Sequence, residues 1–165
     1  MELEDTDLDD ELQSLFSADK ITVMTLGHPL RGDDGVGPYI GAQLVVRDPN
    51  RFQLINAQTT PTNFLGPILE FRPSTLIIID ATDIGEPPGT LIVFDQEDEQ
   101  TKQTATTHYQ GVSTLMEFIH LEAAYQPEVY FICIQIETIE INPNLSSRIQ
   151  LKADQLISLL NKHLD

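Results

Sequence analysis

The sequence predicts an α/β protein with a mostly parallel sheet that helices cover on both faces. Five short runs rich in β-branched residues alternate with segments whose apolar residues recur at helical spacing. The runs are apolar throughout instead of alternating with polar residues, which indicates strands buried on both faces. The length of 165 residues fits one domain.

The chain begins with an acidic leader, residues 1–19, and continues as a single α/β domain, residues 20–165. The density of acidic residues favours a solvated tail for the leader. A short helix with one apolar stripe is the alternative. That stripe would consist of Leu8, Leu12, Leu15 and Phe16.

The first half of the domain predicts two strands and two helices. ITVMTL at 21–26 is a compact β-branched run and predicts the first strand. Apolar residues at helical spacing predict a helix at 36–47, and FQLINA at 52–57 predicts the second strand. A short helix is expected at 62–70, ending near Pro73. This alternation is typical of strands joined by helical crossovers.

The second half begins with TLIIID at 75–80, the strongest predicted strand. TLIVFD at 90–95 predicts a fourth strand, too close for a crossover helix, so we expect a local antiparallel pair. A helix is expected at 112–123 and a fifth strand at 129–137. The most regular helical pattern occupies 145–163.

Charge and composition exclude several classes of protein. The net charge of −17 repels phosphate backbones and anionic membranes, so we expect neither nucleic-acid nor membrane partners. No apolar run reaches the roughly 18 residues of a membrane span, and the leader is not a signal peptide. One cysteine, Cys133, allows no internal disulfide, which suits the cytoplasm. Because it lies in a predicted strand, we expect it to be a core residue.

Candidate functional residues follow the strands, because ligands of open α/β sheets bind beyond the carboxyl ends of the strands. The loop GHPLRGDDGVG at 27–37 follows the first strand and carries Asp33 and Asp34. It lacks the lysine and the glycine spacing of phosphate-binding loops. The alternative for the two aspartates is that they cap the following helix.

Asp80 ends the third predicted strand, and His108 precedes a predicted helix. A carboxylate at the end of an apolar strand is costly unless it has partners or a metal. The alternative is a turn carboxylate that accepts hydrogen bonds from backbone N–H groups. We expect Asp83 to be such a turn residue.

Two carboxylates and one imidazole can therefore converge at one sheet edge: Asp34, Asp80 and His108. This set binds a borderline divalent ion and leaves coordination positions open. Imidazole is a good ligand for nickel, whereas an oxygen-only set favours magnesium or calcium. We expect the other histidines to be exposed, least securely the one in the aspartate loop; they are His28, His120 and His163.

Three motifs in this order resemble the hydrogenase maturation proteases. They are GHPLRGDDGVG at 27–37, FRPSTLIIIDATDIGEPPGTLIVFD at 71–95 and TTHYQG at 106–111. The spacings, 80 − 34 = 46 and 108 − 80 = 28, agree with the branch that processes the hydrogenase-3 large subunit. The resemblance extends from about residue 21 to the last helix and leaves the leader outside.

The resemblance implies a twisted, three-layer fold with five strands between helices. It implies a nickel-dependent endopeptidase that removes the C-terminal extension of a [NiFe]-hydrogenase large-subunit precursor after nickel insertion. Asp34, Asp80 and His108 would contact nickel, which the substrate supplies. Nickel would polarise the scissile carbonyl or activate a water, with Asp34 or Asp80 as catalytic base.

Two segments depart from the family pattern. His28 stands where asparagine is common, and NAQTTPT at 56–62 stands where paired glycines are frequent. These changes concern the groove for the substrate tail more than the metal site.

Three other functions share part of the pattern. A receiver domain also has an acidic pair and a strand-terminal aspartate, but it needs a lysine where QIETIEINP stands at 135–143. A nickel-binding chaperone would use the same ligands without cutting. A metallohydrolase acting on a small molecule is the third alternative.

Overall fold

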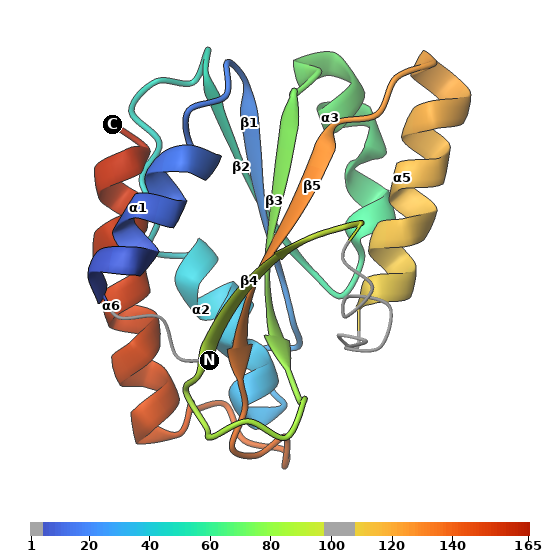
Figure 1. Cartoon of the computed structure of the whole chain (residues 1–165). Helices are drawn as coiled ribbons and strands as arrows, with labels where there is room; N and C mark the ends of the chain where they lie inside the picture. The colour runs from blue at the N-terminus through green and yellow to red at the C-terminus, as the bar shows by residue number, and fades with distance from the viewer. Residues whose placement is uncertain (1–4, 98–107) are drawn as a thin grey trace.

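A five-stranded sheet between two layers of helices forms the centre of the protein (Figure 1). The computed structural model describes residues 5–97 and 108–165. This architecture confirms the predicted fold class. Within these residues, no helix has the length and apolar character needed to cross a membrane.

The strand order in the sheet is β2-β1-β3-β5-β4. The first four strands in this order are parallel, and β4 runs antiparallel to β5 at one edge. The predicted local pair between β3 and β4 is therefore wrong, because the antiparallel partner of β4 is β5, which lies between β4 and β3 in the sheet. The strands are β1 Ile21–Leu26, β2 Phe52–Gln58, β3 Thr75–Thr82, β4 Leu91–Asp95 and β5 Glu128–Gln135.

The helices agree with the expected segments except in the leader, where a solvated tail was favoured, and after the first strand. They are α1 Asp5–Leu15, α2 Val36–Gly41, α3 Leu65–Phe71, α5 Tyr109–Ala123 and α6 Ser147–His163. Short 3-10 turns precede two of them, η1 Gly32–Gly35 before α2 and η2 Pro61–Phe64 before α3.

Helix α2 ends at Gly41, six residues before the expected end. The chain beyond it is held by the C-terminal part of the protein. The backbone N–H of Val45 donates to the Asn161 side chain, and that of Arg47 donates to the Leu164 carbonyl. These long-range bonds satisfy backbone groups that a longer helix would have used internally.

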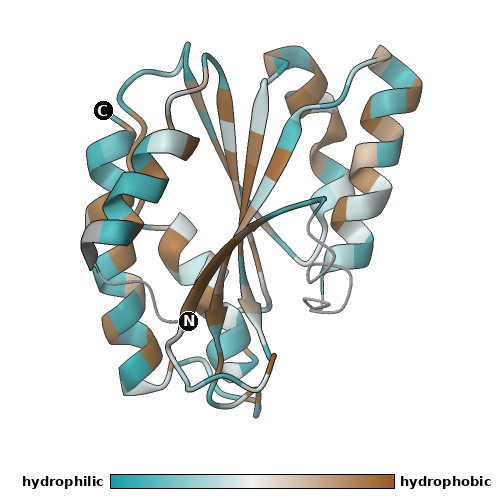
Figure 2. Ribbon diagram, viewed as in Figure 1, coloured by the Kyte–Doolittle hydropathy of each residue, from teal (hydrophilic) through white to brown (hydrophobic). Residues whose placement is uncertain are grey.

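Each face of the sheet has its own apolar core. Helices α1, α2 and α6 cover one face, and α3 and α5 cover the other. Every residue of β1 and of β3 is buried, as the continuous apolar runs predict. Figure 2 shows the hydrophobic strands between helices whose outer sides are hydrophilic.

The solvated-tail interpretation of the leader is wrong for its described part. Helix α1 buries its apolar stripe in the core that it shares with α6 and the sheet. The stripe consists of Leu8 and Leu12, 5% and 0% exposed, with Leu15 and Phe16, 9% and 4% exposed. Burying four such side chains contributes roughly 1.5–3 kcal/mol each, so deleting residues 1–19 would remove core contacts as well as negative charge.

Candidate metal centre

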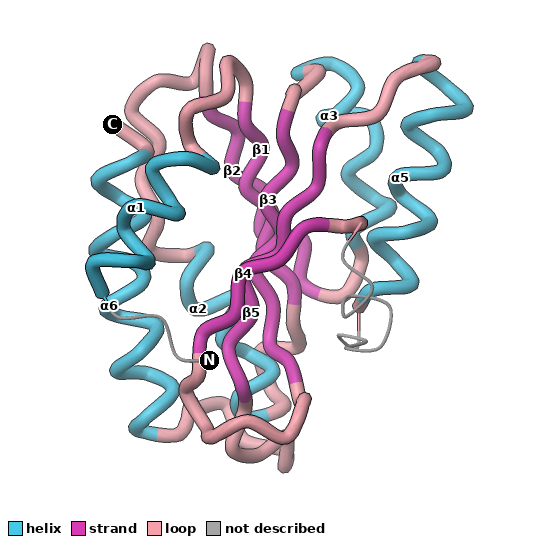
Figure 3. The backbone as a smooth tube through the Cα atoms, in the orientation of Figure 1, coloured by secondary structure: helices cyan, strands magenta, loops and turns pink. Residues whose placement is uncertain are grey.

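Three loops meet at the carboxyl edge of the parallel strands, at the lower end of the molecule in Figures 1 and 3. One follows β1 and leads into η1, one follows β3, and one follows β5 and leads into α6. The start of α5 reaches the same edge, because His108 immediately precedes that helix and contacts the end of β3. The predicted site therefore lies where strand polarity directs it.

Asp34 lies in the buried turn η1 and is 6% exposed. Its Oδ2 accepts a hydrogen bond from the backbone N–H of His28 at 3.0 Å. Gly27 has a φ of +141°, and a Cβ there would lie 1.9 Å from the Asp34 carbonyl oxygen. Glycine at position 27 thus allows the loop to fold back and present the Asp34 carboxylate at the sheet edge.

Asp80 and His108 form a buried pair. The Nδ1 atom of His108 lies 3.2 Å from Oδ1 and 3.1 Å from Oδ2 of Asp80. The Asp80 side chain is 0% exposed and that of His108 is 10% exposed. The backbone N–H of Ala81 donates to Asp80 Oδ1 at 2.8 Å. Asp80 thus accepts one backbone hydrogen bond, as a turn carboxylate would. Its side-chain partner, however, is the imidazole of His108.

The pKa values of this pair reflect its burial. Desolvation raises the pKa of Asp80, against the opposing effect of its hydrogen bond with His108. The Asp80 carboxylate raises the pKa of His108, and the charge of Asp34 raises both pKa values. Negative charge is therefore concentrated at this edge, which attracts a cation.

The structure brings Asp34, Asp80 and His108 together, with one ligand atom of each within 4.8 Å of the others. Bonds from a divalent ion to such ligands are about 2.0–2.2 Å, so two atoms on one ion lie at most about 4.4 Å apart. Binding one ion would therefore require these atoms to approach by at most about 0.4 Å. Two carboxylates and an imidazole fit a borderline divalent ion, whose binding would displace the proton between Asp80 and His108.

Asp33, the neighbour of Asp34, has a different role. Its carboxylate is fully buried and accepts four hydrogen bonds from the loop between β5 and α6. The donors are the backbone N–H groups of Glu137 and Thr138, both at 3.0 Å, and Ser146 through its N–H at 2.7 Å and its hydroxyl at 2.9 Å. No side chain caps η1 or α2, so the helix-capping alternative for the two aspartates is wrong.

The remaining predicted residues lie outside the cluster. Asp83 is exposed in the loop after β3, and its carboxylate accepts a hydrogen bond from the Gln135 side chain instead of the expected backbone N–H groups. Cys133 is a buried core residue, as expected, and burial raises the pKa of its thiol. His120 is exposed.

Two histidines are not exposed, contrary to the sequence prediction. His28 is half-buried, and its Nδ1 accepts from the N–H of Leu30 at 3.2 Å. His163 places Nε2 3.0 Å from Asp9 Oδ1 and stacks on Phe16, so it connects α6 to α1. The apolar periodicity of residues 8–16 was the only sequence indication that α1 forms and can contact α6. The sequence was also compatible with a solvated tail.

Arg31 was not predicted as a site residue. It is exposed, and its charge lowers the pKa of His108, so it lies within electrostatic reach of the cluster. Its backbone forms an isolated parallel β-bridge with Asn142 of the loop after β5. Its position in the loop GHPLRGDDGVG was the only sequence signal.

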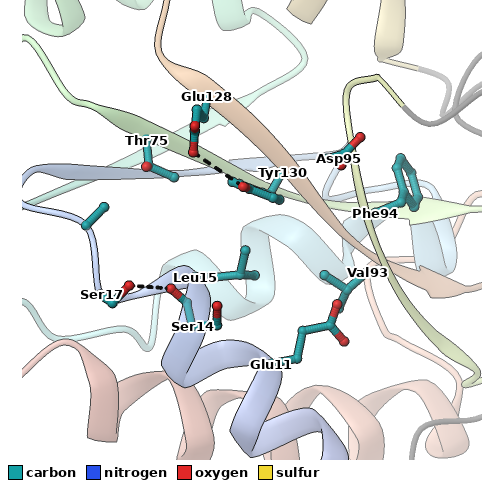
Figure 4. A pocket seen from close by; sticks show the side chains of 11 residues that line it. Glu11, Ser14, Leu15, Ser17, Thr75, Val93, Phe94, Asp95, Glu128 and Tyr130 are labelled. Atoms are coloured by element: carbon teal, nitrogen blue, oxygen red, sulfur yellow. Dashed lines mark hydrogen bonds between the residues drawn. The ribbon is translucent and has the colours of Figure 1, made fainter.

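A hollow of about 420 Å³ lies away from this centre, between α1 and the strands β4 and β5 (Figure 4). Acidic and hydroxyl side chains line it, and some of them bond locally. The Ser17 hydroxyl donates to the Ser14 carbonyl at 2.7 Å, and the Tyr130 hydroxyl donates to Glu128 at 3.3 Å. None of the cluster residues lines this hollow.

Fold and site together define an α/β protein with a candidate divalent-metal centre at the carboxyl edge of its sheet. Comparison with known proteins gives the family. The family model described as hydrogenase maturation protease matches residues 41–163, a segment that includes Asp80 and His108 and begins after Asp34. The chain belongs to the hydrogenase maturation protease family, which confirms the resemblance and contradicts the receiver-domain alternative.

Individual relatives agree with this assignment. The hydrogenase 3 maturation protease of Escherichia coli (strain K12) is 30% identical over 113 residues, which cover 68% of this chain and 70% of that protein. The [NiFe] hydrogenase maturation protease HycI from Thermococcus kodakarensis has a TM-score of 0.80, covers 93% of this chain and 98% of its own, and is 23% identical. The hydrogenase maturating endopeptidase HybD from Escherichia coli has a TM-score of 0.67 at 19% identity, with coverages of 87% and 93%. At these identities the two structures support the fold.

Proposed function

We propose that this chain is an endopeptidase that removes the C-terminal extension of a [NiFe]-hydrogenase large-subunit precursor after nickel insertion. In this proposal Asp34, Asp80 and His108 recognise the nickel that the precursor carries. Family membership supports proteolysis in hydrogenase maturation. The convergence of the three side chains within 4.8 Å is the observation that carries the nickel recognition.

The depth of the cluster fits a metal that arrives with the substrate. Asp80 is fully buried and His108 nearly so, which favours an ion presented by a partner that docks at the sheet edge. Three protein ligands leave coordination positions for groups of the precursor that already hold the nickel. In this proposal nickel is part of the substrate.

The carboxylates also provide a base close to the docked metal. Asp34 Oδ2 accepts one hydrogen bond, from His28, and no described residue donates to its Oδ1. That oxygen is available to bind the ion or to take a proton from an attacking water. Asp80 is the alternative base, with His108 holding its carboxylate in place. Nickel bound here would polarise the scissile carbonyl or activate that water.

The net charge of −17 supports a basic or metal-bearing partner and argues against nucleic acid. With one buried cysteine and a family that acts in hydrogenase maturation, we propose that the protein works in the cytoplasm.

The test uses nickel-loaded and nickel-free precursor large subunits from the same organism. Intact mass measured over time reports the loss of a C-terminal peptide. We expect cleavage of the nickel-loaded precursor only, and we expect Asp80→Asn to abolish it, because the amide keeps the shape and removes the charged ligand. Asp83→Asn is the matched control, since Asp83 lies three residues further on and outside the cluster.

Equal cleavage of the two precursors would remove nickel recognition from the proposal and leave proteolysis. Binding of the nickel-loaded precursor without any cut would favour the chaperone function. Undiminished cleavage by Asp80→Asn would show that this carboxylate is neither ligand nor base.

A further inference from the structure

Exposed apolar side chains gather on two loops at the carboxyl edge of the sheet. Of the seven large apolar side chains exposed in the described part of the chain, three lie here. Leu30 in the loop after β1 is 55% exposed, and Ile139 and Ile141 in the loop after β5 are 47% and 90% exposed. These three residues are called the apolar rim below.

Backbone bonds tie the two loops into one surface. The N–H of Asn142 donates to the Leu30 carbonyl at 3.0 Å, and the N–H of Gly32 donates back to the Asn142 carbonyl at 2.9 Å. Gly32 has a φ of +56°, and a Cβ there would lie 2.9 Å from the Thr138 carbonyl oxygen. The close approach of the loops therefore depends on a residue without a side chain.

The buried carboxylate of Asp33 adds four hydrogen bonds from the second loop and from the residue before α6. Hydrogen bonds therefore hold the backbone of the two loops that carry the rim. An isoleucine that is 90% exposed on such a loop cannot reach the core, because its backbone is held in place.

The apolar rim lies beside the candidate metal centre. Leu30 precedes Asp34 by four residues in one loop, and the backbone N–H of Asp33 donates at 3.0 Å to the carbonyl of Thr138, the residue before Ile139. A pocket of about 290 Å³ lies next to the rim, between the same two loops and the helices α2 and α6. Its lining is rich in apolar groups: Pro29, Pro38, Tyr39, Pro143 and Leu145.

We propose that the apolar rim is the docking surface for an apolar segment of the metal-bearing precursor, beside the bond that is cut. This inference rests on the proposed function and names a contact surface for its substrate. Asp80 and His108 are buried, and the third cluster residue, Asp34, lies in the loop that carries Leu30, so a protein that docks on the cluster also approaches the rim. The apolar side chains that it covers lose contact with water, which favours the complex.

A second copy of this chain is a poorer occupant of the rim. Each copy carries a net charge of −17, so two copies repel each other. A partner that carries a divalent metal is instead attracted by this negative charge.

The test combines Ile139→Ser and Ile141→Ser in one full-length variant. The control combines Val45→Ser and Leu121→Ser, which are also exposed, at 56% and 70%; Val45 lies beside the C-terminal end of α6 and Leu121 in the last turn of α5. Cleavage kinetics and direct binding are measured with nickel-loaded precursor, and thermal unfolding checks that both variants fold. We expect the rim variant to raise KM and the dissociation constant roughly tenfold, with kcat within about twofold, while the control resembles the wild type.

A rim variant that binds and cuts like the control would overturn the docking surface, while wild-type cleavage would leave the proposed function standing. If the wild type binds the precursor without cutting it and the rim variant binds less tightly, the docking surface stands and the proposed proteolysis fails. If the wild type does not bind the nickel-loaded precursor, both inferences are wrong.

Discussion

Asp33 and Asp34 are neighbours in one buried turn, yet their carboxylates have different surroundings. Asp33 is fully buried and accepts four hydrogen bonds from its own chain. Asp34 is 6% exposed, accepts one backbone hydrogen bond, and lies within reach of Asp80 and His108.

The difference separates anchoring from ligand binding. A carboxylate whose oxygens are saturated by backbone and hydroxyl donors stabilises the fold and has little capacity left for a metal. A buried carboxylate with an oxygen to spare, next to an aspartate and a histidine, is suited to an external cation. Burial alone would not distinguish the two residues, whereas their hydrogen-bond partners do.

The largest expected effect is on stability, from Asp33→Ala. The change leaves four donors without their acceptor, so we expect the free energy of unfolding to fall by more than about 3 kcal/mol. Urea unfolding measures it, with Asp34→Ala as the matched control, for which we expect about 1 kcal/mol. Equal losses in the two variants would abolish the distinction between anchor and ligand.

The next effect is on activity, from Asp34→Asn. The amide removes a charged ligand but can still accept the hydrogen bond from His28. We expect nickel-dependent cleavage to fall at least about 100-fold, equivalent to about 2.7 kcal/mol, with stability nearly unchanged. Cleavage kinetics and urea unfolding on one preparation separate the two quantities. Normal cleavage with reduced stability would make Asp34 a second anchor.

A smaller effect is expected from Ser146→Ala, which removes the hydroxyl donor to Asp33 and keeps the backbone donor. The loss of one hydrogen bond to a charged group is about 1.5–3 kcal/mol at most, and less than the loss from Asp33→Ala. In the double variant with Asp33→Ala, the serine change should have almost no additional effect. Additive losses would show that Ser146 stabilises the protein independently of Asp33.

The smallest effect is expected from His28→Asn, which introduces the residue common in the family. Asp34 accepts its hydrogen bond from the backbone of residue 28, which this substitution retains. An asparagine side chain can also accept from the N–H two residues on, as His28 Nδ1 does from Leu30. We expect the thermal unfolding midpoint to change by less than about 3 °C and cleavage to change little. A large loss of cleavage would make the imidazole part of the site.

Local patterns predicted most of the fold. The apolar runs located all five strands to within two residues at each end, because strands buried on both faces need continuous apolar sequence. The helix expected at 62–70 appears as η2 and α3, ending at Arg72 and Pro73, where a left-handed residue and a proline stop it. Helix α6 was also located to within two residues, from its apolar periodicity.

Long-range contacts caused the differences. Local sequence does not specify whether β4 pairs with β3 or with β5, because the pairing depends on the order in which the chain crosses the sheet. The shortened α2 results from bonds to the C-terminal helix and its end, more than 110 residues away. The acidic leader folds because α6 and the sheet offer an apolar surface to its stripe, which outweighs its charge.

The motifs and the polarity of the strands were enough to predict at which sheet edge the candidate site lies and that Asp34, Asp80 and His108 form it. Strand direction is enough for this, because parallel strands end at one edge. Only the tertiary structure decided how the adjacent aspartates divide their roles, since the donors to Asp33 come from a loop about 105 residues later. It also decided that two loops distant in sequence join into an apolar rim, because backbone hydrogen bonds between distant segments leave no periodic pattern in the sequence.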